Sequence, residues 1–131
     1  MTRINHIAIL VEDIEKALPF WQDALGLELA EIEEVEAEKA RVAFFPTGES
    51  QIELVQPTDP ETGLGRYLSK HGGGMHHLCL EVADIEASLA RLKAHGIELI
   101  NETPRQRDSG TRYAFIHPQS TGGVLVELYQ V

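Results

Sequence analysis

The chain of 131 residues contains a single cysteine, Cys79. One cysteine excludes an intrachain disulfide, and it excludes any zinc site built mainly from cysteines. No apolar run approaches the roughly 18 residues that span a bilayer. The N-terminus also lacks the layout of a signal peptide. We therefore expect a cytoplasmic protein with no membrane partner.

Basic residues are scarce as well. The chain has 11 Lys and Arg against 21 Asp and Glu, a formal net charge of −10. Residues 1–38 hold ten of the acids and two of the bases, so most of the excess lies there. Nucleic acids and anionic membranes are bound by basic surfaces, so we expect neither as a main partner.

An internal repeat is the most informative feature of the sequence. Residues 4–18 (INHIAILVEDIEKAL) match residues 75–89 (MHHLCLEVADIEASL). The match predicts a single domain made of two modules, 1–57 and 75–131, joined by a linker at 58–74. The linker is rich in glycine and contains Pro60, which is typical of turns.

Each module has the pattern of a β-α-β-β-β unit. Strands are predicted at Ile4–Val11 and Met75–Val82, each followed by an aspartate in the N-cap position of an amphipathic helix. Pro19 is expected to kink or shorten the first helix, and Gly26 and Gly96 are expected to end the two helices. Further strands are predicted near 27–35, 40–46, 50–56, 97–102, 112–117 and 123–130. One module has too few strands to bury its sheet, so we predict an α+β fold of two paired βαβββ modules.

The repeat brings two kinds of metal-binding residue into register. His6 corresponds to His77, and Glu53 corresponds to Glu127 near the ends of the two modules. A single strand histidine is more often a hydrogen-bonded structural residue, and a single strand glutamate is usually solvated. Two matched pairs favour a shared mixed nitrogen and oxygen site for Zn, Fe, Co, Ni or Mn. Strand alternation supports this site, because it turns each glutamate away from its apolar neighbours.

These residues resemble those of a known family. The paired modules with their His/Glu site look like the vicinal oxygen chelate superfamily, and within it the methylmalonyl-CoA epimerase family. The most specific matches are KHGGGMHHLCLEV at 70–82 and HPQSTGGVLVELYQ at 117–130. The resemblance implies a curved mixed sheet around a metal site, a homodimer, and one divalent ion per chain, such as Co, Mn, Zn or Ni.

The resemblance also implies roles for single residues. His6, His77 and Glu127 match the metal ligands of the family, and Glu53 matches a fourth ligand position. The implied reaction is the interconversion of (R)- and (S)-methylmalonyl-CoA, with Glu127 and Glu53 as candidate proton-transfer groups. Some relatives place a further glutamate where this chain has Val42, so that role does not transfer.

Coenzyme A is polyanionic and needs cationic contacts. Candidates outside the acidic N-terminal third are Lys70, Arg105 and Arg107, with Arg66 and Arg112 beside them in the sequence. The alternatives are another metalloenzyme of the same fold, namely a glyoxalase or a dioxygenase, and a metal-free module that binds a small molecule. A dioxygenase would use a site of two histidines and one carboxylate, which His6, His77 and Glu127 could also form.

Overall fold

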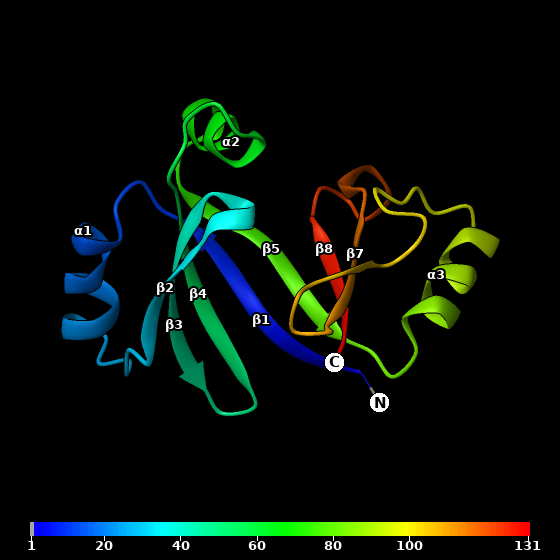
Figure 1. Ribbon diagram of the computed structural model, residues 1–131, viewed down its shortest axis with the longest axis horizontal. Coiled ribbons are helices and arrows are strands. Elements are labelled where there is room, and N and C mark those ends of the chain that lie inside the picture. The colour runs from blue at the N-terminus through cyan, green and yellow to red at the C-terminus, as the bar shows by residue number, and fades with distance from the viewer. Residues whose placement is uncertain (1) are drawn as a thin grey trace. The chain divides into compact units, whose positions relative to one another are not determined.

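A computed structural model describes residues 2–131 and has an α+β fold (Figure 1). The strands are β1 (Arg3–Leu10), β2 (Glu31–Val35), β3 (Ala40–Thr47), β4 (Ser50–Pro57), β5 (Gly74–Glu81), β6 (Arg105–Gln106), β7 (Arg112–Ile116) and β8 (Val126–Gln130). The α-helices are α1 (Ile14–Leu18), α2 (Gly63–His71) and α3 (Ile85–Ala94), with short helical turns η1 (Pro19–Ala24), η2 (Glu36–Glu38) and η3 (Pro118–Ser120). None of these helices is long and apolar enough to cross a bilayer. The α+β class predicted from the sequence is confirmed.

The chain forms two compact units. One runs from Ile7 to His76, and the other combines the start of the chain up to His6 with His77–Val131. Strand β1 therefore begins in one unit and continues into the other. The boundaries of these units differ from those of the modules predicted at 1–57 and 75–131, and the single domain stays a prediction.

The Ile7–His76 unit has the strand order β2-β3-β4-β1. Strand β1 pairs parallel with β4, and β3 pairs antiparallel with both β2 and β4. Helix α1 packs on one face, where Ile14, Ala43, Phe45 and Leu54 form a buried core. Helix α1 ends at Leu18 and the chain continues as the π-helical turn η1, because Pro19 has no N–H for the next α-helical hydrogen bond.

The other unit repeats this plan. The first residues of β1 are followed across the sheet by β5, β8, β7 and β6. Strand β5 pairs parallel with β8, and β7 pairs antiparallel with β8 and β6. Helix α3 covers one face through a core of Ile85, Leu89, Ala114, Ile116 and Leu128.

The predicted helix caps are confirmed. The Asp13 side chain accepts a hydrogen bond from the N–H of Glu15, and Asp84 accepts one from the N–H of Ala87. Gly26 and Gly96 follow the two helical segments with φ of 83° and 74°. Only glycine adopts this left-handed conformation without steric cost, so the repeat also determines where each helical segment ends.

The predicted strand at 97–102 is reduced to a single bridge between Leu99 and Ile116. The Phe115 carbonyl accepts hydrogen bonds from the N–H groups of both Ile100 and Asn101, and the Asn101 side-chain oxygen accepts the Phe115 N–H. An asparagine side chain thus takes the place of a backbone partner. Regular pairing with β7 resumes only at β6.

The linker at 58–74 contains a helix that the sequence pattern does not predict. Helix α2 begins after Thr62, whose hydroxyl accepts the N–H of Gly65. A Cβ atom at Gly65 would lie 2.4 Å from the Asp59 carbonyl oxygen, so only glycine fits this close approach. Two glycines in the first turn lower intrinsic helix propensity, and tertiary packing outweighs that cost.

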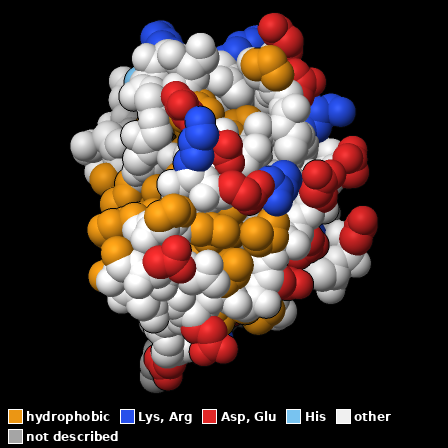
Figure 2. Space-filling view, turned by 90° about the vertical axis from the view of Figure 1, so that its left-hand side faces the viewer, with side chains coloured by type: hydrophobic (Ala, Val, Ile, Leu, Met, Phe, Trp, Pro, Cys, Tyr) orange, Lys and Arg blue, Asp and Glu red, His pale blue; other side chains and the backbone are white. Residues whose placement is uncertain are grey.

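Apolar side chains gather on the α1 side of the Ile7–His76 unit (Figure 2). Phe20 and Leu25, in η1 and just after it, are 56% and 52% exposed. Acidic side chains lie around this apolar surface in the same view (Figure 2). An apolar patch with a charged rim is typical of a surface that binds another protein.

Candidate metal centre

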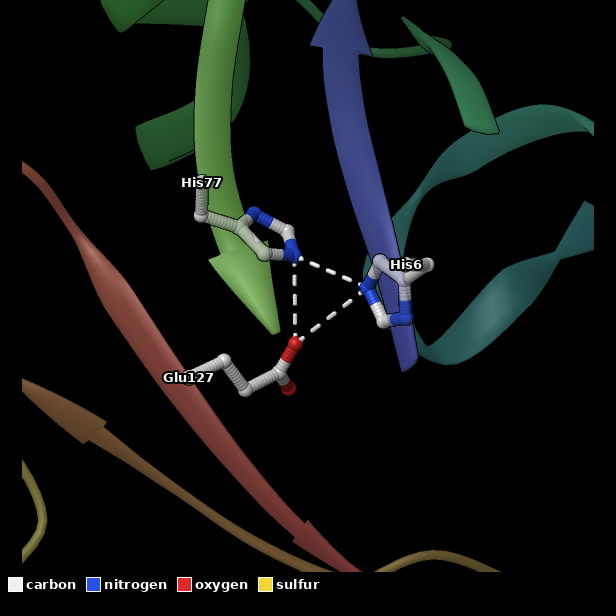
Figure 3. A group of neighbouring side chains, drawn as sticks. All are labelled: His6, His77 and Glu127. Carbon is white, nitrogen blue, oxygen red and sulfur yellow. Dashed lines mark hydrogen bonds and ion pairs between the residues drawn. The ribbon is translucent and has the colours of Figure 1, made fainter. Parts of the chain in front are cut away.

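Three of the predicted ligands lie close together in one compact unit. His6 comes from β1, His77 from β5 and Glu127 from β8, and their side chains point toward one another (Figure 3). The Nε2 atoms of the two histidines are 3.2 Å apart. Oε1 of Glu127 lies 3.1 Å from Nε2 of His77 and 3.5 Å from Nε2 of His6. His6 and Glu127 are buried, and His77 is half-buried.

The alternation of β8 explains why Glu127 points to the histidines. Val126 and Leu128 pack on the α3 side of the sheet, as part of that core. Successive strand residues face opposite sides, so Glu127 lies on the other face. The alternation predicted from the sequence for this strand is therefore confirmed.

The spacing of the three ligand atoms fits one divalent ion. Ligands about 2.0–2.2 Å from an ion lie roughly 3.0–3.5 Å from one another in tetrahedral or octahedral geometry. The three separations between these atoms fall in this range. Two imidazoles and one carboxylate suit a transition metal or zinc better than calcium.

Asn5 orients the His6 ring. Its side-chain oxygen lies 2.7 Å from Nδ1 of His6, and its Nδ2 donates to Oε1 of Glu81 at 3.4 Å. The second bond assigns the amide orientation, so the Asn5 oxygen accepts the Nδ1–H of His6. This contact leaves Nε2 as the nitrogen that faces Glu127, and a histidine that binds a metal ion through Nε2 does so with that nitrogen unprotonated.

Glu127 is a strongly anionic group despite its burial. Burial is the largest single influence and raises its pKa, but the hydrogen-bonding contacts with His6 and His77 and their charges act in the opposite direction. These contacts prevail and lower the pKa of Glu127 from 4.5 to about 2. The group is therefore an ionised carboxylate at neutral pH, the form that binds cations.

Arg107 approaches the same carboxylate from the other side. Its Nη2 donates to Oε2 of Glu127 at 3.3 Å, and its guanidinium lies 4.2 Å from the centre of the Tyr113 ring. Tyr129 contributes a second ring, 5.6 Å from the guanidinium. Arg107 thus lies beside the candidate metal centre, whereas Arg105 on β6 and Lys70 on α2 are exposed. The predicted roles of Lys70, Arg105 and Arg107 in binding substrate stay predictions.

Glu53 belongs to the Ile7–His76 unit. It is half-buried on β4, and Oε2 accepts a hydrogen bond from Nε2 of Gln51 at 3.0 Å. Ile52 and Leu54 contribute to the α1 core, so Glu53 faces the opposite side of the sheet. Its roles as fourth ligand and as a proton-transfer group stay predictions.

Sequence reasoning missed several residues around the three ligands. Asn5, Tyr129 and Phe115 were not singled out, yet Tyr129 and Phe115 make edge contacts with the rings of His6 and His77. Strand alternation could have identified Tyr129, because it lies two residues after Glu127 on the same face. No local signal marks Asn5, whose role depends on the neighbouring strand β5.

We expect Asn5→Ala to weaken binding of Co²⁺ by about 10- to 100-fold, because groups that orient a ligand histidine have effects of this size. Asn5→Asp should keep affinity near that of the wild type, since a carboxylate oxygen can accept the same Nδ1–H. Isothermal titration of the metal-free proteins with CoCl₂ measures both. Equal dissociation constants for Asn5→Ala and the wild type would contradict this role.

Comparisons with known proteins identify the family of this chain. A family model described as the Glyoxalase/Bleomycin resistance protein/Dioxygenase superfamily matches residues 5–115. The chain is 38% identical to the uncharacterized protein YqjC of Bacillus subtilis, over 98% of this chain and 91% of YqjC. It is 35% identical to the ethylmalonyl-CoA/methylmalonyl-CoA epimerase of Cereibacter sphaeroides, over 98% of each protein.

A solved structure of an epimerase is also similar to this chain. A variant of the Streptomyces coelicolor methylmalonyl-CoA epimerase in complex with 2-nitronate-propionyl-CoA matches with a TM-score of 0.87 and 32% identity, over 99% of this chain and 94% of that protein. The resemblance predicted from the sequence and the vicinal oxygen chelate fold are thereby confirmed. With two histidines and a carboxylate at its centre and a family match over most of its length, the chain belongs to the glyoxalase, bleomycin resistance protein and dioxygenase superfamily.

Proposed function

We propose that this chain is a metal-dependent epimerase that interconverts (R)- and (S)-methylmalonyl-CoA. One observation carries the proposal: His6, His77 and Glu127 lie close together, two of them buried, in a chain that is similar over nearly its whole length to epimerases of this substrate. In the reaction, a proton leaves the carbon between the thioester and the carboxylate, and a proton returns to the opposite face of the enolate.

His6, His77 and Glu127 would hold the divalent ion. The ion would supply positive charge that stabilises the enolate and orients the substrate oxygens. The protein's own part is to hold the imidazole lone pairs and the carboxylate ready for binding. Asn5 does this for His6 through its contact with Nδ1.

The proton-transfer groups are part of the proposal. Oε1 of Glu127 lies against the histidines and Oε2 accepts from Arg107, an arrangement that favours a ligand role over a role as a base. We propose Glu53 as the base for one face of the α-carbon, because it is a half-buried carboxylate on the face of the sheet opposite the α1 core. Val42 is buried and cannot accept a proton, so a different group must serve the second face.

The remaining parts of the proposal concern partners and location. Lys70 and Arg105 are exposed cations that can contact the phosphates of coenzyme A. We propose a homodimer, which the exposed Phe20 and Leu25 support as apolar surface for a second copy. We also propose a cytoplasmic location, as the single cysteine suggests.

We expect the Co²⁺-loaded protein to exchange the α-proton of methylmalonyl-CoA for deuterium in D₂O. Treatment with EDTA should abolish the exchange, and added Co²⁺ should restore it, because the enolate needs the stabilising charge. Proton NMR of the α-position follows the exchange directly. A blank without protein measures the spontaneous exchange.

This exchange experiment, together with an assay on a hemithioacetal, separates the alternatives. Stoichiometric metal without α-proton exchange would exclude the epimerase, and turnover of a hemithioacetal in its place would identify a glyoxalase. A protein that binds no metal and shows no turnover would be the small-molecule binding module.

A further inference from the structure

The side chain of Arg107 is half-buried and contacts the buried carboxylate of Glu127. It follows β6 directly and begins a tight turn, in which its N–H donates to the Thr111 carbonyl and its own carbonyl accepts the N–H of Gly110. The turn holds the backbone of Arg107 at the end of the β6–β7 hairpin. Its side chain reaches back across the sheet toward β8, where Glu127 lies.

The guanidinium is held by two kinds of contact. Nη2 donates to Oε2 of Glu127 at 3.3 Å, and the guanidinium carbon lies 4.2 Å from the centre of the Tyr113 ring and 5.6 Å from that of Tyr129. Aromatic faces attract a guanidinium through their quadrupoles. The cation is therefore kept beside Glu127 and does not extend into solvent as a phosphate contact at the surface would.

The two oxygens of Glu127 have different partners. Oε1 lies 3.1 Å from Nε2 of His77, and Oε2 lies 3.3 Å from Nη2 of Arg107. Glu127 therefore offers one oxygen to an ion between the histidines, and its negative charge is offset by the arginine. The two imidazoles are neutral when they act as ligands. A divalent ion held here would keep most of its positive charge for a further ligand.

We infer that Arg107 is a specificity-determining residue that offsets the charge of Glu127, so that the centre selects anionic oxygen chelators. The inference rests on the metal site of the proposed function, and it assigns Arg107 to the acyl end of the substrate and not to the coenzyme A phosphates. A malonyl thioester has a carboxylate, and its enolate has a second anionic oxygen. Such a ligand gains more from an added positive charge than a neutral ligand does.

Malonate and imidazole are the probes for this inference, one an anionic chelator and the other a neutral ligand. The protein is loaded with Co²⁺, and the visible cobalt spectrum reports the binding of each probe. We expect Arg107→Gln to bind malonate about 10- to 100-fold more weakly than the wild type, from the loss of one unit charge near the ion. Imidazole affinity should change by less than about threefold, because a neutral ligand feels little of this charge.

Two further variants test whether charge is the cause. Arg107→Lys keeps the unit charge and should bind malonate within about fivefold of the wild type. Arg105→Gln removes an exposed arginine two residues away and should leave malonate binding unchanged. If Arg107→Gln does not fold, Arg107→Met retains contact with the Tyr113 ring and is measured by the same criteria.

Several results would overturn the inference. The first is an equal affinity for malonate in Arg107→Gln and the wild type, and the second is an equal loss of malonate and imidazole affinity in Arg107→Gln. The third is an equal loss of malonate affinity in Arg107→Lys and Arg107→Gln. The fourth is a wild-type protein that binds no Co²⁺. The titrations contain no acyl-CoA. A wild type that meets the malonate criteria but fails to exchange the α-proton would therefore overturn the proposed function and leave the role of Arg107 intact.

Discussion

Replacing His77 by alanine is expected to weaken Co²⁺ binding by more than about 100-fold, beyond the effect of losing an orienting group. His77 offers one of three candidate ligand atoms, 3.2 Å from Nε2 of His6 and 3.1 Å from Oε1 of Glu127. Its removal leaves two ligands, which hold a divalent ion poorly. Metal-dependent exchange of the α-proton should fall below detection in the same variant.

A thermal measurement provides a second test of His77. Metal that binds only the folded state raises its stability by mass action. Saturating Co²⁺ should raise the Tm of the wild type and leave that of His77→Ala unchanged. His95→Ala is the matched control, because His95 lies in the same unit, is exposed and caps α3 through the Arg91 carbonyl. A Tm of His77→Ala that rises with Co²⁺ as much as that of the control would remove His77 from the centre.

Replacing Phe45 by alanine is expected to destabilise the protein by about 3–5 kcal/mol. Phe45 is fully buried and packs with Ile14, Ala43 and Leu54 between β3, β4 and α1. The loss is a large part of the roughly 5–15 kcal/mol that stabilises a typical domain. Thermal unfolding should show a Tm lower by about 10 °C or more.

The matched control for Phe45 is Phe20→Ala. Phe20 is 56% exposed in η1, and the change in the side chain is the same. In the single chain its loss should cost less than about 1 kcal/mol, because more than half of the residue already contacts water. Similar unfolding temperatures for the two variants would show that the α1 core does not stabilise this unit as the packing implies.

Local patterns predicted much of the fold. Asp13 and Asp84 cap their helices, and Gly26 and Gly96 take the left-handed conformation that ends each helical segment. Such signals act over a few residues, because a cap or a turn depends on backbone groups close in sequence. The strand at 97–102 is lost because the Asn101 side chain binds the Phe115 N–H, fourteen residues away. Periodicity within a segment cannot reveal such a contact.

Part of the candidate centre could likewise be predicted from the sequence. His6, His77 and Glu127 could be identified from the sequence as candidate metal ligands. The repeat aligns His6 with His77 and Glu53 with Glu127, and this alignment needs no coordinates. Strand alternation then placed Glu127 on the face opposite Leu128, as the structure confirms. Glu53 was selected by the same repeat, and its role as a fourth ligand stays a prediction.

The two-module plan, the α+β class and the three candidate ligands could all be predicted from the sequence, because periodicity, caps and the repeat are properties of the chain alone. The residues that surround these candidate ligands could be identified only in the folded structure. Asn5 meets Glu81 across 76 residues, and Arg107 meets Glu127 across 20. The side-chain partners of Asn5 and Arg107 depend on which distant strands become neighbours. The orientation of His6 and the charge beside Glu127 are therefore consequences of packing.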